Sequence, residues 1–386
     1  MWSVAAIYLA FALPSSMLGV MWPDVRVRFG QSLGALGLVT LSYGIGRLST
    51  AMIGRPMVER FGMARAFIVS LVALATACAC IAGAVSWPMF LVGVGALGIA
   101  AGSLDSIGST FITRRAHVGD AGLLHGFYGL GATIGPLVVA VTATWRIAVT
   151  ASVVTAIAAA VSTSSSTEWP PMAPADPRRR DDSSARIPRI AVAASVLVLG
   201  AFVAIEVTIG LWAYTYLTGA RDVSDTVGAI GVAGFWGAST FGRLTMAHPG
   251  VARLTDRVGL PGLAAAGTLM FLGVIVVPAA ASIVFLAFAG LVLSPIVPTL
   301  FATTAMRVGT GLAAHASGWQ LAATNVGAIS VPALIGALVD SRGPSIIPVV
   351  AILVLLAVGL PLLVIINRLP DRQVVTAGRP FRRRPA

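Results

Sequence analysis

Lysine is absent from this chain of 386 residues, and charged residues of any kind are scarce. All 26 basic residues are arginines, only 14 residues are acidic, and charged residues make up 10% of the sequence. A soluble domain carries about 25% charged residues. This scarcity, together with a hydrophobic content of 57% and a mean hydropathy of +0.91, excludes a soluble protein and indicates one embedded in a lipid bilayer.

Cysteine is also rare. Cys78 and Cys80 lie two residues apart in an apolar segment, so they do not share a helix face and are expected to pack as apolar side chains. The sequence contains neither a nucleophile–base set nor a cluster of metal ligands, and we expect no enzyme activity, cofactor or metal. The isoelectric point near 11.3 would suit nucleic-acid binding. However, the arginines flank apolar segments, where membrane orientation explains them, so we predict no nucleic-acid partner.

Long apolar runs follow one another along the chain, and they do not alternate as the strands of a membrane barrel would. Each run is long enough to cross a bilayer as a helix. The N-terminal run lacks the features of a cleaved secretory signal and is read as a permanent span. We therefore predict an all-α polytopic membrane protein with twelve transmembrane helices, at residues 2–23, 32–54, 66–86, 89–113, 120–143, 146–163, 190–218, 224–247, 262–280, 282–306, 311–338 and 344–367.

The arginines are distributed unevenly between the two sides of the membrane that these spans define. If the N-terminus is cytoplasmic, the inner segments hold 19 arginines and the outer segments hold 5. Because basic residues concentrate in cytoplasmic loops, we predict that both termini are cytoplasmic. The expected location is the cell (inner) membrane, with the lipid bilayer as surroundings, and we expect a monomer.

One long hydrophilic segment, rich in serine, proline and arginine, divides the spans into two groups of six. Its composition favours a flexible linker over a folded domain. The predicted organisation is an N-terminal six-helix bundle at 1–163, a cytoplasmic linker at 164–189, a C-terminal six-helix bundle at 190–367 and a basic cytoplasmic tail at 368–386.

The two halves repeat several landmarks at a nearly constant offset of about 196 residues. The matching landmarks are Gly46–Leu48 with Gly242–Leu244, Glu59–Gly62 with Asp256–Gly259, and Gly131 and Pro136 with Gly327 and Pro332. A repeat that spans six helices returns each motif to the same side of the membrane, and in this it resembles the two halves of the major facilitator superfamily.

The segment GRPMVERFGMAR, residues 54–65, resembles the signature cytoplasmic loop of that superfamily. Glu59, Arg60 and Gly62 take the positions of its acid, arginine and turn glycine, although Arg55 stands where its upstream glycine is expected. The resemblance implies a cytoplasmic gate, and simple helix capping is the alternative. The gate would also include Asp256 and Arg257, the repeat counterparts of Glu59 and Arg60. Arg47 and Arg243 are further gate candidates, because they lie about two helical turns from the cytoplasmic ends of spans 2 and 8. The alternative is that these two arginines reach the lipid headgroups.

Two acids lie deep inside apolar spans, Asp105 in span 4 and Glu206 in span 7. A carboxylate at this depth costs a few kcal/mol, so it is expected to face a polar cavity and to handle protons or substrate; a structural hydrogen bond is the alternative. Asp105 shares a helix face with Gly98, Gly102 and Ser109. Such a small-residue face either packs closely on another helix or leaves room for a substrate.

Span 4 and the stretches 123–137 and 204–217 resemble the sugar-porter branch that includes the fucose–proton symporter. The resemblance implies that Asp105 takes the place of an acid involved in proton coupling, with a sugar as substrate. Ser109 stands where that branch usually has asparagine. Span 1 contains no acid at mid-membrane depth, because Asp24 lies at its outer end.

Other polar or aromatic residues in the spans are weaker candidates. His125 titrates in a range suited to proton relay, although a satisfied interfacial histidine is the alternative. Trp212 could stack on a sugar ring or simply pack in the core. Ser109, Gln320 and Asn325 would suit a hydroxyl-rich ligand, while packing between helices explains them equally well.

The sequence thus predicts a secondary transporter that couples protons to the symport of a sugar or similar small polar metabolite by alternating access. Asp105, Glu206 and His125 are the predicted proton-coupling or substrate-binding groups. One alternative keeps the fold but exports drugs or metabolites in exchange for protons, which a mostly apolar cavity would favour. A second alternative is a membrane receptor or sensor that transports nothing.

Overall fold

The computed structural model describes residues 2–50, 52–115, 118–142, 144–166, 169, 189–246 and 248–368. These residues form helices and contain no strand. The first half comprises α1 (Trp2–Val20), α2 (Trp22–Phe29), η1 (Leu33–Ala35), α3 (Leu36–Ser49), α4 (Gly54–Phe61), α5 (Met63–Ala82), α6 (Trp87–Arg115), α7 (Val118–Val141) and α8 (Trp145–Ser165). The second half comprises α9 (Arg189–Arg221), α10 (Asp225–Thr245), α11 (Pro249–Val276), α12 (Ala279–Leu293), α13 (Ile296–Ala302), α14 (Thr304–Val308), α15 (Thr310–Arg342), α16 (Ile346–Val354), η2 (Leu355–Gly359) and α17 (Leu360–Asn367).

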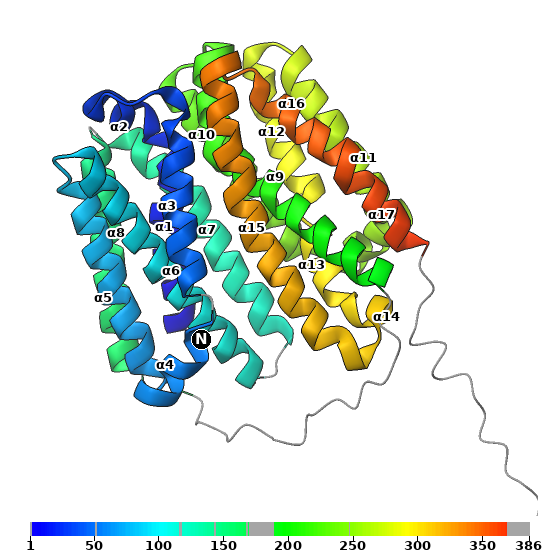
Figure 1. Ribbon diagram of the computed structural model, residues 1–386, viewed down its shortest axis with the longest axis horizontal. Helices are drawn as coiled ribbons and strands as arrows, with labels where there is room; N and C mark the ends of the chain where they lie inside the picture. Colours follow the sequence, from blue (N-terminus) through cyan, green and yellow to red (C-terminus); the bar gives the residue numbers. More distant parts are fainter. Residues whose placement is uncertain are drawn as a thin grey trace, which may run out of the picture.

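The long helices run roughly side by side between two ends of the molecule (Figure 1). One end carries α2 and is called here the α2 end. The opposite end carries α4 and α14 and is called the α4 end; Figure 1 shows it at the bottom, with the start of the chain. The segment 170–188 and residues 369–386, predicted as parts of the linker and the tail, lie outside the described residues.

Each of the twelve predicted spans coincides with a helix or a run of successive helices. Ten helices in the described part of the chain are long and apolar enough to cross a membrane, and the bent pair of α3 and α4 brings the number to eleven. The remaining segment is α10, which is rich in glycine and carries Arg243. The prediction of an all-helical polytopic membrane fold is confirmed.

The ends of several spans differ from the prediction. Residues 54–61 form the amphipathic helix α4, whereas their sequence predicts a loop. The tenth span breaks between α12 and α13 at Ser294 and Pro295, because proline lacks the amide N–H that would continue the helix. Pro14, Pro136 and Pro332, in contrast, lie inside continuous helices.

The repeat predicted from the sequence is visible in the backbone. Gly62 has φ of 80° and Gly259 has φ of 70°, a left-handed region that favours glycine. Each glycine ends a short helical segment and turns the chain into the next long helix. The same turn therefore follows the second span and the eighth span.

Glycines bring the two halves into close contact near the α2 end. A Cβ added at Gly34 would collide with the carbonyl oxygen of Gly336, and one added at Gly37 would lie 2.7 Å from the carbonyl oxygen of Ala333. Between α1 and α9, a Cβ at Gly19 would likewise collide with the carbonyl oxygen of Leu211. Backbones can approach this closely only where side chains are absent. The halves are thus tightly packed at this end.

Candidate functional site

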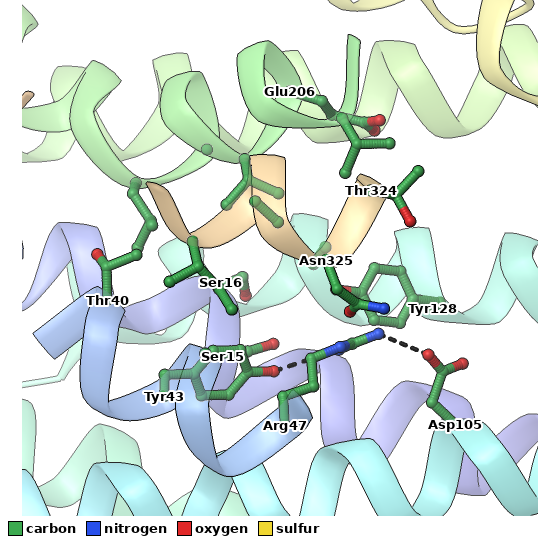
Figure 2. A pocket seen from close by; sticks show the side chains of 18 of the residues that line it. Ser15, Ser16, Thr40, Tyr43, Arg47, Asp105, Tyr128, Glu206, Thr324 and Asn325 are labelled. Carbon is green, nitrogen blue, oxygen red and sulfur yellow. Dashed lines mark hydrogen bonds and ion pairs between the residues drawn. The ribbon is translucent and has the colours of Figure 1, made fainter. Parts of the chain in front are cut away.

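A cavity of about 290 Å³ lies between the two halves and is drawn in Figure 2. Its size approaches the range of small-molecule sites, about 300–1,000 Å³. The first half lines it with Tyr8, Ser15, Ser16, Leu18, Thr40, Tyr43, Gly44, Arg47, Asp105, His125, Tyr128 and Ala132. The second half contributes Val203, Glu206, Val207, Gly210, Leu211, Trp236, Arg243, Phe301, Leu321, Thr324, Asn325, Ala328 and Ile329.

Arg47 of α3 and Asp105 of α6 form an ion pair in this cavity. The Nη2 atom of Arg47 donates to the Oδ2 atom of Asp105 at 2.5 Å (Figure 2). The close approach of the two helices depends on glycines of α6: a Cβ at Gly98 would collide with the Tyr43 carbonyl oxygen, and one at Gly102 would lie 2.5 Å from the Arg47 carbonyl oxygen. The small-residue face of span 4 therefore packs against α3 and sets Arg47 beside Asp105.

A second ion pair joins Arg243 of α10 to Glu206 of α9. The Nη2 atom of Arg243 donates to the Oε1 atom of Glu206, and the Ser239 hydroxyl lies 3.5 Å from the same oxygen. These side chains keep 23% and 18% of their exposure, compared with 26% and 31% for Arg47 and Asp105. Both pairs are therefore shielded from bulk solvent but open to the cavity.

The two arginines are related by the repeat, but their acidic partners are not. Arg47 and Arg243 are 196 residues apart, and the same offset from Asp105 leads to Phe301. Going back by the same offset, the counterpart of Glu206 is Ala10. One arginine thus takes its acid from the fourth span of its half, and the other takes its acid from the first span of its half.

Aromatic and imidazole groups surround the first ion pair. The Tyr43 hydroxyl lies 3.5 Å from Nη1 of Arg47. The ring of Tyr8 meets the ring of His125 edge-on, with centroids 6.0 Å apart. Together with Tyr128, these groups give the first-half wall several hydrogen-bonding atoms close to Asp105.

The structure brings together only part of the residue set predicted from the sequence. Asp105, Glu206, His125 and Asn325 all line the cavity. The Asn325 amide nitrogen donates to the Leu321 carbonyl oxygen at 2.9 Å within its own helix.

Three predicted substrate-contact residues lie elsewhere. Ser109 is exposed and does not line the cavity. Trp212 is fully buried, and its Nε1 atom donates to the Pro332 carbonyl oxygen at 3.0 Å, so it joins α9 to α15. Gln320 is also fully buried and outside the cavity.

Gln320 belongs to a separate polar cluster near the α4 end. Its Oε1 atom accepts from the Thr304 hydroxyl at 3.0 Å. The neighbouring Arg307 lies between the tenth and eleventh predicted spans and donates from Nε to the Ser195 hydroxyl at 2.9 Å. Burial lowers the pKa of Arg307 to about 10, which still leaves the guanidinium charged at neutral pH. This cluster holds α14 against α9 and α15.

The residues predicted to form a gate divide into two groups. Arg47 and Arg243, predicted as gate residues from their equal depth in spans 2 and 8, line the cavity, each with an acidic partner. Glu59 is on α4, where its Oε1 atom accepts from Nε of Arg55 at 2.7 Å. Arg60 lies over the Phe61 ring, and both Asp256 and Arg257 are exposed.

Helix α4 is tied directly to the helix that carries Asp105. The backbone amide of Gly54 donates to the Ser106 hydroxyl at 3.0 Å. A Cβ at Gly54 would collide with the backbone of Ser106, so the two helices touch at the residue next to the acid. The signature-like loop and the cavity are therefore mechanically connected.

Several cavity residues were not predicted, notably Tyr8, Tyr43 and Trp236. Trp236 carried no signal of this in the sequence; only the structure shows that Thr40, 196 residues before it, also lines the cavity. For Tyr8 and Tyr43 the available signal was a tyrosine in mid-span, since a phenol in a bilayer needs a polar partner. Among the residues that the structure describes, no group of three or more histidine, cysteine or acidic side chains could hold a metal ion.

The family follows from a comparison with protein-family models. The model for the Major Facilitator Superfamily matches residues 4–332. This chain belongs to the Major Facilitator Superfamily. Membership makes the protein a multi-pass membrane transporter rather than an enzyme, and the small-molecule substrate of such a transporter would bind in a cavity between the halves.

Solved structures of similar fold cover nearly the whole chain. A bacterial homolog of the human lysosomal transporter Spinster, solved in an inward-facing and occupied conformation, has a TM-score of 0.72 and 12% identity, over 95% of this chain and 96% of that one. A mutant of the nucleoside transporter NupG gives 0.73 and 13%, over 94% and 98%. A D-xylose–proton symporter gives 0.69 and 14%, over 96% and 97%.

At these identities the likeness shows the fold alone. The matches therefore establish the superfamily fold but do not single out the fucose–proton symporter branch that the sequence resembles. The comparison with curated proteins found no match.

Proposed function

We propose that this member of the Major Facilitator Superfamily is a proton-coupled symporter of a sugar or a similar small polar metabolite. The observation that carries the proposal is the presence of two acid–arginine pairs in one cavity between the halves. Carboxylates at bilayer depth are costly and typically belong to proton or substrate pathways. Alternating access would expose this cavity to each side of the membrane in turn.

The ion pairs provide a way to couple protons to substrate. A proton on Asp105 removes its negative charge and with it the attraction that holds Arg47. Arg47 is then free to donate hydrogen bonds to the oxygens of a substrate in the same cavity. Loss of the proton restores the pair and withdraws those donors. Glu206 and Arg243 offer the same chemistry on the opposite wall.

His125 is a proposed relay for the proton. It lines the cavity, is exposed, and lies beside the Tyr8 ring. An imidazole can accept and release a proton near neutral pH. A proton could therefore reach Asp105 from the α4 end through groups that already line the site.

The fold neighbours provide modest support for a sugar-like substrate. One is a D-xylose–proton symporter, and another is a nucleoside transporter. Their identity to this chain is 14% or less, so the substrate remains a proposal carried by the cavity chemistry. We also propose that the protein works as a monomer in the cell membrane with both termini cytoplasmic, as the arginine distribution predicts.

Proton-driven export is the second candidate, and one observation favours it. Most of the second-half wall is apolar, with Val203, Val207, Leu211, Phe301 and Ile329. Exporters of drugs or apolar metabolites would bind their cargo against such a surface. The direction of transport separates the two candidates.

The test uses proteoliposomes that contain a pH-sensitive dye and are challenged with a panel of sugars and nucleosides. Wild type is compared with Asp105→Asn and Glu206→Gln, and Asp24→Asn, an exposed carboxylate of α2, serves as the control. Symport predicts that one substrate acidifies the lumen, that the control retains the signal and that at least one cavity variant loses it. Folded protein that gives no signal with any compound, but releases preloaded apolar cargo under a proton gradient, would support export instead.

A further inference from the structure

The two walls of the cavity differ sharply in chemistry. Nine of the twelve lining residues from the first half carry a polar side chain. Only four of the thirteen from the second half do, when Trp236 is treated as apolar because most of its side chain is an aromatic ring. On the second-half wall, Glu206 and Arg243 are paired with each other. The Thr324 hydroxyl and the Asn325 amide both donate to the Leu321 carbonyl oxygen, at 2.8 Å and 2.9 Å. The second-half wall is thus apolar with few unused donors.

Two residues that line the cavity each carry a buried donor atom with no hydrogen-bond partner among the described residues. The donors are the Tyr8 hydroxyl, which packs against Gly108, and Nε1 of Trp236, which packs against Gly210; the two residues line opposite walls, but both donor atoms are covered. Tyr8 is 1% exposed and Trp236 is 9% exposed. Buried polar atoms are rarely left unpaired in native proteins, and an exception calls for an explanation. A bound molecule that accepts a hydrogen bond from each donor, after a small turn of the ring uncovers it, would provide it.

The charges of the cavity cancel in pairs. Arg47 neutralises Asp105, and Arg243 neutralises Glu206. A charged substrate would have to break one of these pairs or enter without a counter-charge, and desolvating an uncompensated charge is expensive. The cavity therefore favours an uncharged molecule.

We propose that the substrate is an uncharged amphipathic molecule, with a hydroxyl-bearing head against the first-half wall and an apolar body against the second-half wall. Tyr8 and Trp236 determine its specificity by each donating one hydrogen bond to it. This inference rests on the proposed function as a transporter and narrows the substrate class. An aryl glycoside is the simplest probe that carries both parts, and an oxygen near the aryl group serves as the acceptor for Trp236.

The experiment measures binding to the purified full-length protein by calorimetry, without a proton gradient. Phenyl β-D-glucoside is compared with D-glucose, which lacks the apolar body, with benzyl alcohol, which lacks the sugar, and with phenyl β-D-glucuronide, which adds a carboxylate. The phenyl glucoside is expected to bind about ten-fold more tightly than D-glucose, since burial of an aromatic ring contributes at least this factor. It is also expected to bind more tightly than benzyl alcohol, which lacks the hydroxyl-bearing head, and than the glucuronide, whose added carboxylate would be desolvated without a partner.

Two isosteric variants test the named donors. Tyr8→Phe and Trp236→Phe each remove one donor and keep an aromatic ring, so each is expected to weaken binding of phenyl β-D-glucoside by about five-fold, the effect of one neutral hydrogen bond. The controls are Tyr216→Phe and Trp2→Phe. Tyr216 bonds the Val274 carbonyl oxygen outside the cavity, and Trp2 is 77% exposed. Both controls are expected to bind the glucoside as wild type does.

The outcomes separate this inference from the proposed symport. Equal affinity for glucose and phenyl glucoside, or unchanged affinity in both Tyr8→Phe and Trp236→Phe, overturns the inference even if a sugar acidifies proteoliposomes. Folded protein that binds none of the four probes also overturns it. Tight binding of the glucoside that needs both donors, but drives no proton movement, upholds the amphipathic substrate and overturns symport.

Discussion

The carboxylate of Asp340 accepts a hydrogen bond from the Gly34 amide at 2.6 Å. Asp340 lies near the end of α15 in the second half, so its carboxylate caps the start of η1 in the first half. Its other oxygen accepts from the Ser32 hydroxyl at 2.7 Å. An acid at the N-terminus of a helical segment is stabilised by the unpaired amide groups there. These bonds lie beside the close backbone contact of Gly34 with Gly336, so hydrogen bonding and tight packing both hold the two halves together at the α2 end.

Loss of this contact should open the α2 end. Asp340→Ala removes both acceptors, and Gly34→Ala places a methyl group against the Gly336 carbonyl oxygen. The reporter is a cysteine introduced at Thr40, a buried residue that lines the cavity. Cys80 is replaced by alanine in every protein so that it does not react. We expect both variants to increase the rate at which the reporter cysteine reacts with a water-soluble maleimide. The control is Ser341→Ala, whose hydroxyl bonds only within its own helix. Labelling at the wild-type rate in both variants would contradict a closing role.

The ion pair of Arg47 and Asp105 should show strong energetic coupling. Arg47→Gln or Asp105→Asn alone leaves the remaining charge poorly compensated. We expect each to lower the free energy of unfolding by about 1–3 kcal/mol. The loss is smaller than for a fully buried pair because 26% of the Arg47 side chain and 31% of the Asp105 side chain are exposed. The double variant should recover part of this loss. Thermal unfolding of the four proteins in detergent measures the coupling, and strictly additive effects would exclude a functional pair in the folded state.

The packing of α3 on α6 should tolerate no added methyl group at Gly98. Gly98→Ala places a Cβ against the Tyr43 carbonyl oxygen, and overpacking of this kind costs about 1–3 kcal/mol. Gly318→Ala is the matched control, because that glycine is also helical but its added Cβ would meet no atom within 4 Å. We expect a lower unfolding temperature and weaker transport only for Gly98→Ala. An equal response of the two variants would show that helix propensity, rather than packing, dominates.

Two arginines close the α2 ends of corresponding helices. Arg146 donates to the carbonyl oxygens of Ala82 and Ala84 at 2.7 Å each, beyond the end of α5. Arg221 donates to the carbonyl oxygens of Ile275 and Val277 at the end of α11. Cations are stabilised at helix C-termini, where carbonyl groups lack partners.

Replacement of either capping arginine should destabilise the fold without altering substrate recognition. Hydrogen bonds to charged groups contribute about 1.5–3 kcal/mol, so Arg146→Gln and Arg221→Gln are each expected to lower the unfolding temperature measurably. Arg342→Gln, another arginine predicted on the outer side, is the comparison. If binding affinity per folded molecule fell in step with stability, the arginines would have a role beyond capping.

The fold could be predicted from the sequence because its signals are local and repeated. Apolar length defined the spans, and the recurring glycine turn after spans 2 and 8 indicated two equivalent halves. The short helix α4 was missed because its eight residues, about two turns, are too few to show a long apolar period. The division into domains at residues 163 and 190 remains a prediction from composition.

The site was only partly predictable, because burial depth does not reveal which way a side chain points. Asp105 and Glu206 stood out through their cost in a bilayer, and both line the cavity. Trp212 and Trp236 are both tryptophans in apolar spans, yet only the second reaches the cavity. Arg47 was predicted as a gate residue from the equal depth of Arg47 and Arg243. Its acidic neighbour could not be predicted, because the glycines of α6 set that contact between helices, and a single sequence does not display such a relationship.

Arg47 and Arg243 occupy equivalent positions in the two halves, whereas their acidic partners Asp105 and Glu206 do not. This difference bears on how the molecule evolved. A chain assembled from two copies of residues 1–163 would inherit two acids of the Asp105 type and nothing in the position of Glu206. Two copies of the second half would inherit the reverse. Duplication can therefore have supplied the frame, but each half has since acquired its own chemistry. Neither half can therefore replace the other, and a substitution of Asp105 or Glu206 is not compensated by an equivalent acid in the other half.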